Sequence, residues 1–174
     1  WRGGKGALGV RKGPDPNPIY DTFLIAGEQS GQGITDDLNG FNPEGLSRLD
    51  ATISNGRRNS SATTFLNPAL KRDNIKLQKN ILVEKIFLEN DRAVGIEVSE
   101  KGQKYRIEAE KEIILSAGAL NSPQILMLSG IGPADHLRNI GSNVSHDLPG
   151  VGQNLQDHAT VSISWECLKE FEAH

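Results

Sequence analysis

"EIILSAGALNSPQILMLSGIG", residues 112–132, joins an apolar run to a short helix-like segment that ends in Ser-Gly-Ile-Gly. Its first part, residues 112–118, contains a continuous apolar run and then small residues, as in a buried strand that leads into a strand-to-helix turn. Ser122 is predicted to cap the helix that follows, with Pro123 at the first helical position. The stretch therefore predicts an α/β core. The expected apolar side of the helix consists of Ile125, Leu126 and Leu128.

Gly118 lies at the predicted turn, where the absence of a Cβ lets the backbone approach a ligand or a neighbouring element closely. Free amides at the start of the helix would point toward the carboxyl end of the strand. This geometry suits an anion or a cofactor. An ordinary tight turn inside an α/β core explains the same residues, so both interpretations stay open at this point.

The residues before this stretch have the pattern of an antiparallel meander. Three runs rich in β-branched residues are separated by connections short enough for hairpins. The runs are residues 80–89, 92–100 and 103–111. After the stretch, a second short helix is predicted from Pro133 to Gly141, and "ATVSISWEC", residues 159–167, alternates like a strand with one buried face.

The first 70 residues are mostly loop, with a few local signals. A strand-like piece is predicted around residues 7–11. Asn17 is expected to cap a helix that starts at Pro18. Ile19, Phe23 and Ala26 are expected to fall on one face of that helix.

Further along, residues 34–59 are dense in Asp, Asn, Gly and Pro, and only "RLDATIS", residues 48–54, alternates like a strand. A short helix is expected within residues 60–70, interrupted by Pro68.

Composition excludes several classes of function. Lys and Arg number 19 against 22 Asp and Glu, giving a net charge of −3 and no basic stripe for nucleic acid. The single cysteine, Cys167, excludes an intrachain disulfide framework and a cysteine-rich metal site. No apolar run approaches the roughly 18 residues of a membrane span. Neither end of the sequence has the features of a natural terminus, so we expect the chain to be an internal piece of a longer protein.

Two local motifs have ordinary explanations. "GKGALG", Gly4 to Gly9, fits the dinucleotide-binding pattern G-x-G-x-x-G, but no buried strand precedes it and no helix follows. Arg57 and Arg58 could bind a carboxylate or phosphate, although a solvated or salt-bridging pair is the commoner outcome.

"GALNSPQILMLSGIG", residues 118–132, resembles the second signature of the glucose-methanol-choline (GMC) oxidoreductases, which are FAD-dependent alcohol-oxidising enzymes. Other segments resemble that family in its own order, and most closely its choline dehydrogenase branch. They are "DDLNGFNPEG" (36–45), "NGRRNSSA" (55–62), "NPALKRDNIKLQ" (67–78), "RAVGIEV" (92–98) and "DLPGVGQNLQDH" (147–158). The similarity extends over nearly all 174 residues.

The resemblance implies a fold and its domains. The fold class is α/β with α+β character: part of an FAD-binding Rossmann-like domain with a β-meander, plus part of a substrate-binding domain. Residues 1–70 would be mostly substrate-domain scaffold, and residues 71–150 the FAD-binding part. Residues 151–174 would cross back into the substrate-domain sheet.

The resemblance also implies site residues. The backbone of Val83 would hydrogen-bond the adenine, and Ser116, Ala117 and Gly118 would border the ADP portion of FAD. Ser122 is included as a cofactor-site residue, although capping its helix is the more natural role for its hydroxyl. The sequence predicts no metal ligands.

No catalytic residue is expected within the chain, because the family's catalytic His lies downstream of these residues. Asp157 stands beside His158, which suggests a catalytic base, but adjacent side chains in an extended segment usually point apart. We therefore expect a structural hydrogen-bonding role for His158.

The implied function is oxidation of the CH–OH group of choline or another primary alcohol by hydride transfer to FAD. After the "NLQDH" motif, choline-oxidising members tend to carry an acidic residue, where this chain has residues 159–161, Ala-Thr-Val. The substrate thus stays open. The electron acceptor would be a quinone or respiratory chain, or oxygen.

The compartment also stays open: cytoplasmic or membrane-associated in bacteria, or mitochondrial. A non-catalytic flavin-binding relative would share these motifs. A nicotinamide-dependent Rossmann enzyme is a weaker alternative, because a meander stands where that fold would alternate strands and helices.

Overall fold

The computed structural model describes residues 3–13 and 17–166. The chain divides into two compact units, described separately below: one runs to Leu77 and includes the chain from Ser164 onward, and the other is Gln78–Ile163. Both helices and strands occur, so the α/β class is confirmed at the level of a mixed fold.

Helix α1, Pro18–Gln29, begins in the first unit where the sequence predicts it. The side chain of Asn17 accepts a hydrogen bond from the Ile19 amide at 3.0 Å, which satisfies one of the free amides of the first turn. The face that carries Ile19, Phe23 and Ala26 is not buried: Phe23 is 52% exposed, and the buried residue of the helix is Gly27. The Leu46 side chain occupies the space where a Cβ of Gly27 would lie, so the helix packs closely against Leu46 at this position.

The strands of the first unit are short. β1, Arg11–Lys12, pairs antiparallel with β2, Asp50–Ala51. β3, Ile53–Ser54, and β4, Arg57–Arg58, form a hairpin closed by two residues with positive φ. The strand-like pieces predicted around residues 7–11 and 48–54 are thus present but mostly irregular.

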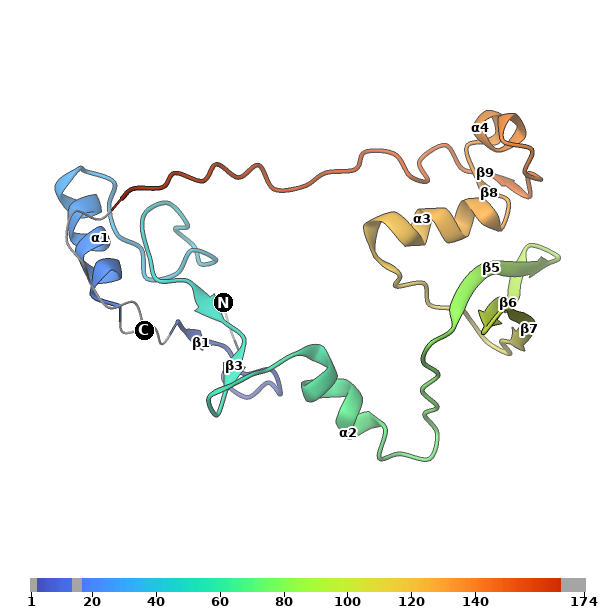
Figure 1. Cartoon of the computed structure of the whole chain (residues 1–174), viewed down its shortest axis with the longest axis horizontal. Helices are drawn as coiled ribbons and strands as arrows, with labels where there is room; N and C mark the ends of the chain where they lie inside the picture. The colour runs from blue at the N-terminus through green and yellow to red at the C-terminus, as the bar shows by residue number, and fades with distance from the viewer. Residues whose placement is uncertain (1–2, 14–16, 167–174) are drawn as a thin grey trace. The chain divides into compact units, whose positions relative to one another are not determined.

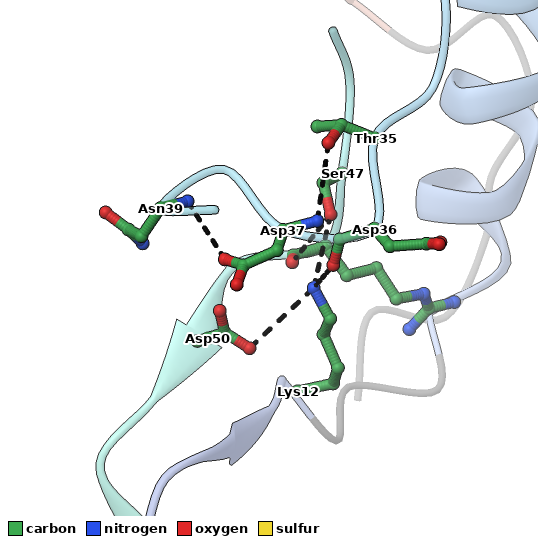
Figure 2. A network of polar contacts seen from close by, with 8 residues as sticks. Lys12, Thr35, Asp36, Asp37, Asn39, Ser47 and Asp50 are labelled. Atoms are coloured by element: carbon green, nitrogen blue, oxygen red, sulfur yellow. Dashed lines mark hydrogen bonds and ion pairs between the residues drawn. The ribbon is translucent and has the colours of Figure 1, made fainter. Parts of the chain in front are cut away.

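Lys12 fixes the acidic loop between α1 and β2 (Figure 2). Its ammonium group donates hydrogen bonds to the Asp36 carbonyl and to Ser47 Oγ, the latter at 3.4 Å, and lies 3.7 Å from the Asp50 carboxylate. Thr35, which is buried, donates its hydroxyl to a loop carbonyl 2.7 Å away. Polar contacts, rather than the burial of apolar side chains, therefore fix the conformation of this loop.

The helix predicted within residues 60–70 forms, but Pro68 does not interrupt it. A five-residue π-helix, Ala62–Leu66, is followed directly by α2, Asn67–Ala69. The Asn67 amide donates to the Ala62 carbonyl, which is the wide turn of a π-helix. Pro68 then lies at the start of the α-helical turn, where its missing N–H has little effect.

The second unit contains the predicted meander (Figure 1). Its strands pair antiparallel in the order β5–β6–β7. They are β5, Leu82–Glu89; β6, Arg92–Glu100; and β7, Gln103–Glu108. Each connection is two residues long with positive φ, as type I′ hairpin turns require: Asn90-Asp91 and Lys101-Gly102. The prediction of three strands joined by two tight turns is confirmed.

Charged side chains cover one part of the meander. The Lys104 ammonium group hydrogen-bonds Glu84 and lies 3.6 Å from Glu97. The hydrogen bond to Glu84 is the main cause that raises the pKa of Lys104. Arg106 bonds Glu89 at 3.0 Å, and this bond raises the pKa of the guanidinium. These pairs lie at the surface and contribute little individually.

Helix α3, Gly118–Leu128, starts five residues earlier than predicted, so Pro123 lies inside it. Ser122 does not precede the helix; its hydroxyl accepts a hydrogen bond from the Ala117 amide at 3.0 Å. Of the expected apolar side, Ile125 is buried, Leu126 is half-buried and Leu128 is 57% exposed.

Residues 112–117 form no strand, although the sequence predicts one there. Ile114 is 80% exposed. A buried strand requires neighbours that share its backbone hydrogen bonds, and none of the described strands pairs with this segment. The prediction is wrong for the described structure because an apolar run cannot supply its own partner.

Beyond α3, the chain makes a small parallel pairing of β8, Ile131–Gly132, with β9, His146–Asp147. Between them lies α4, Ala134–Asn139, with Leu137 fully buried. Asp147 Oδ1 accepts a hydrogen bond from the Ala134 amide at 3.0 Å and so caps α4 from β9. The second predicted helix is confirmed. Residues 159–166 form no strand, and Cys167 lies outside the described residues.

Candidate functional site

A cleft of about 420 Å³ opens between the meander and the segment that enters α3. Its volume is in the range of small-molecule sites. Three of the five predicted site residues, Val83, Ser116 and Ala117, line it. The other lining residues are Leu82, Ile86, Ile96, Ile113, Ile114, Leu115, Asn121, Gln124 and Ile125.

Val83 reaches this cleft because β5 is one of the two edge strands of the meander. It pairs with Val98 of β6, whose side chain is fully buried, and the β5–β6 register shifts between Val83 and Lys85. A register shift at an edge re-aims the local backbone and interrupts the regular ladder. Val83 therefore lies at an irregular point of this strand, on the wall of the cleft.

Ser116 and Ala117 lie on the opposite side of the cleft, in the irregular segment before α3. The hydrogen bond from the Ala117 amide to Ser122 Oγ ties this segment to the helix. Ser122 itself lines a separate hollow on another face of α3, together with Val151 and Leu155. Its hydroxyl thus shapes the cleft wall indirectly, through Ala117.

Gly118 has a φ of +89°, which a residue with a Cβ rarely adopts. An added Cβ would meet no atom of the described chain within 4 Å. The glycine is therefore required by the backbone turn, and no neighbouring element of the described structure accounts for it.

Ser129 holds the two walls of the cleft together, a role that sequence reasoning missed. Its hydroxyl accepts a hydrogen bond from the Ile86 amide of β5 at 2.7 Å and donates to the Ile125 carbonyl of α3 at 2.6 Å. Ile86 and Ile125 are each 8% exposed. The only signal for Ser129 was its place in the Ser-Gly-Ile-Gly motif, which says nothing about its partner on β5.

Asn121 and Gln124 were also missed. They stand three residues apart on α3, so they lie on the same helical face, and both line the cleft. With Ser116 they are the lining residues whose side chains carry polar atoms. The cleft thus combines aliphatic walls with a hydroxyl and two carboxamides, the mostly apolar lining with few polar groups that small-molecule sites have.

The remaining candidate residues, His158, Arg57 and Arg58, do not line the cleft. The His158 side chain is exposed and makes no hydrogen bond with another described residue, while its backbone amide donates to Asp157 Oδ1 at 2.8 Å. The expected structural hydrogen bond of the imidazole is therefore not found. Arg57 and Arg58 are exposed on β4.

Within residues 3–13 and 17–166, no group of acidic, His or Cys side chains is arranged to hold a metal. The described helices include none with the length and hydrophobicity of a membrane span.

The sequence model of the GMC oxidoreductases matches residues 3–160. The chain belongs to the GMC oxidoreductase family. It is 47% identical over 174 residues to human mitochondrial choline dehydrogenase, covering 100% of this chain and 29% of that protein. It is 51% identical over 168 residues to the oxygen-dependent choline dehydrogenase of Brucella ovis, covering 96% of this chain and 30% of the relative.

Solved structures agree with this family assignment. An FAD-dependent oxidoreductase from Chaetomium thermophilum matches with a TM-score of 0.84 and 30% identity, over 90% of this chain and 28% of that one. Pyridoxine 4-oxidase from Mesorbium loti matches with a TM-score of 0.78 and 30% identity, over 85% and 29%. The chain thus spans about 30% of the length of its relatives.

The cleft fits one part of the cofactor of such enzymes. A purine ring is flat and largely apolar with a polar edge, which matches aliphatic walls that carry carboxamides on one side. The lining residues are therefore compatible with the adenine portion of FAD.

Proposed function

We propose that this chain forms one wall of the FAD site of an alcohol-oxidising GMC oxidoreductase. The single observation that carries the proposal is the cleft that brings Val83 of β5 beside Ser116 and Ala117 before α3. These positions are more than 30 residues apart in the sequence and were assigned to the same cofactor from the family resemblance. Their meeting in one cavity is independent of that assignment.

Each site residue has a distinct proposed task. The backbone of Val83 hydrogen-bonds the adenine ring. Ser116 and Ala117 border the ADP portion, and Gly118 supplies the turn that carries the chain past it. Ser122 holds the Ala117 amide in place and so positions this border.

The proposed domain arrangement follows the family. Residues 71–150 belong to the Rossmann-like FAD-binding domain and contribute the meander and α3. Residues 1–70 belong mostly to the substrate domain, and residues 151–174 cross back into it. The division of the structure into compact units after Leu77 supports the first of these boundaries approximately.

The reaction is oxidation of the CH–OH group of an alcohol. FAD, when bound, supplies the hydride acceptor, and this chain contributes binding and positioning of the cofactor. No residue of the chain is assigned a catalytic role; the base that removes the hydroxyl proton is expected in another part of the protein.

The substrate and the acceptor rest on the relatives. Choline or another primary alcohol is the proposed substrate, because the most similar relatives named above are choline dehydrogenases. Oxygen is a proposed electron acceptor because the Brucella ovis relative is named oxygen-dependent. A quinone or respiratory chain is the other.

The test is to purify the intact protein and record its absorbance spectrum before and after denaturation. A flavin spectrum, with FAD released on denaturation, is expected, together with turnover of choline or a simple primary alcohol. Absence of flavin after reconstitution with FAD would refute the cofactor site. Bound FAD that no alcohol reduces would favour a non-catalytic relative.

A further inference from the structure

Gln124 lines two adjoining hollows. It lines the main cleft beside Val83 and also lines an adjoining hollow of about 360 Å³ that includes Glu84 and Lys85. Asn121, one helical turn earlier, lines the main cleft only. Gln124 therefore lies where the two hollows meet, opposite strand β5.

The Gln124 carboxamide is available to a ligand. It is exposed and makes no hydrogen bond with any other described residue. A primary carboxamide carries two N–H donors and an acceptor oxygen. The group can thus present a donor and an acceptor side by side to a bound molecule.

The helix presents this carboxamide from a fixed place. Ile125, the next residue, is buried against the meander, and the hydroxyl of Ser129 links the Ile125 carbonyl to the Ile86 amide. These contacts hold the turn of α3 that carries Gln124 at a defined distance from β5. Pre-organisation of this kind reduces the entropy lost on binding.

We propose that Gln124 determines the base specificity of the cofactor site by pairing its carboxamide with the edge of the adenine ring. The inference rests on the proposed FAD site. Adenine presents an amino donor beside a ring-nitrogen acceptor, which a Gln carboxamide matches with two hydrogen bonds. Guanine presents two acceptors at the same edge, so one would face the carboxamide oxygen unfavourably.

The experiment measures base discrimination in the intact protein freed of flavin. ADP and GDP are titrated calorimetrically, which isolates the base because the two nucleotides share ribose and phosphates. A two-bond carboxamide–adenine pair predicts that ADP binds roughly 5- to 150-fold more tightly than GDP. Gln124→Ala should bring this ratio close to one.

Two further variants sharpen the test. Gln124→Glu keeps the acceptor oxygen and loses the N–H donor, so it should weaken ADP binding while leaving the fold intact. Gln103→Ala, an exposed position on β7, is the matched control and should leave the ratio unchanged. Ala is a strong helix former, so Gln124→Ala should not unfold α3.

The outcomes separate this inference from the proposed function. If the wild-type protein binds neither FAD nor ADP, the proposed function fails and the inference fails with it. If it binds both and Gln124→Ala keeps the wild-type ratio, only the role of Gln124 is overturned. Loss of discrimination in Asn121→Ala but not in Gln124→Ala would also overturn it.

Discussion

Replacing Ser129 by Ala tests whether α3 is fastened to the meander as the structure shows. The hydroxyl bonds the Ile86 amide and the Ile125 carbonyl, but the loss is unequal, because that carbonyl also accepts the Ser129 backbone amide at 3.1 Å. Only the Ile86 N–H would lose its partner. Ile86 is 8% exposed, so water replaces the bond poorly. A buried donor left unsatisfied costs about 1–3 kcal/mol, and we expect a loss near 2 kcal/mol.

The assay is hydrogen exchange of the intact protein, which reports local opening at the Ile86 amide without assuming that a multidomain chain unfolds in one step. Ser129→Ala should accelerate exchange at Ile86 by roughly 30-fold, as 2 kcal/mol implies. Ser129→Thr, which keeps a hydroxyl, should restore most of the protection. Ser145→Ala, at an exposed serine, is the control. Unchanged exchange at Ile86 in Ser129→Ala would refute the proposed fastening.

Three other predictions concern the scaffold. Gly130→Ala should destabilise the second unit more than Gly141→Ala in thermal unfolding: both have positive φ, but only at Gly130 would a Cβ lie 2.9 Å from a backbone oxygen. Equal losses would contradict the crowding at Gly130. Because hydrogen bonding to Glu84 raises the pKa of Lys104, its stabilisation is present below the ordinary value of 10.5 and lost as pH rises through the folded value. Lys104→Met should therefore flatten the alkaline fall in melting temperature, and an unaltered fall would argue against this contribution. Asn17→Ala should lower stability by about 1 kcal/mol in denaturant unfolding, and no loss would mean that its cap is dispensable.

Local signals predicted the elements whose causes lie within a few residues. The runs of β-branched residues are separated by connections short enough for hairpins, so the meander could be placed strand by strand, and the structure closes it at Asn90-Asp91 and Lys101-Gly102. Asn17 followed by Pro18 located the start of α1, because a side-chain cap and a proline at the first helical position are also local signals. The family resemblance assigned Val83 and residues 116–118 to the same cofactor. In the structure, Val83, Ser116 and Ala117 line one cleft.

The errors occur where the outcome depends on partners distant in the sequence. Residues 112–117 have the composition of a buried strand, yet pairing is decided by neighbouring strands. Ser122 was expected to cap from outside the helix, but its hydroxyl serves the Ala117 amide from within α3. Ser129 bonds a strand 43 residues earlier, a contact that no local pattern encodes.

The most direct test of the proposed cofactor site is an experimental structure of the intact protein with its bound flavin. The adenine ring of FAD should lie between β5 and the start of α3, with the Val83 backbone at hydrogen-bonding distance and Gln124 at the edge of the ring. An adenine ring bound elsewhere, with the cleft filled by other side chains of the protein, would contradict the assignment of Val83, Ser116 and Ala117 to the FAD site.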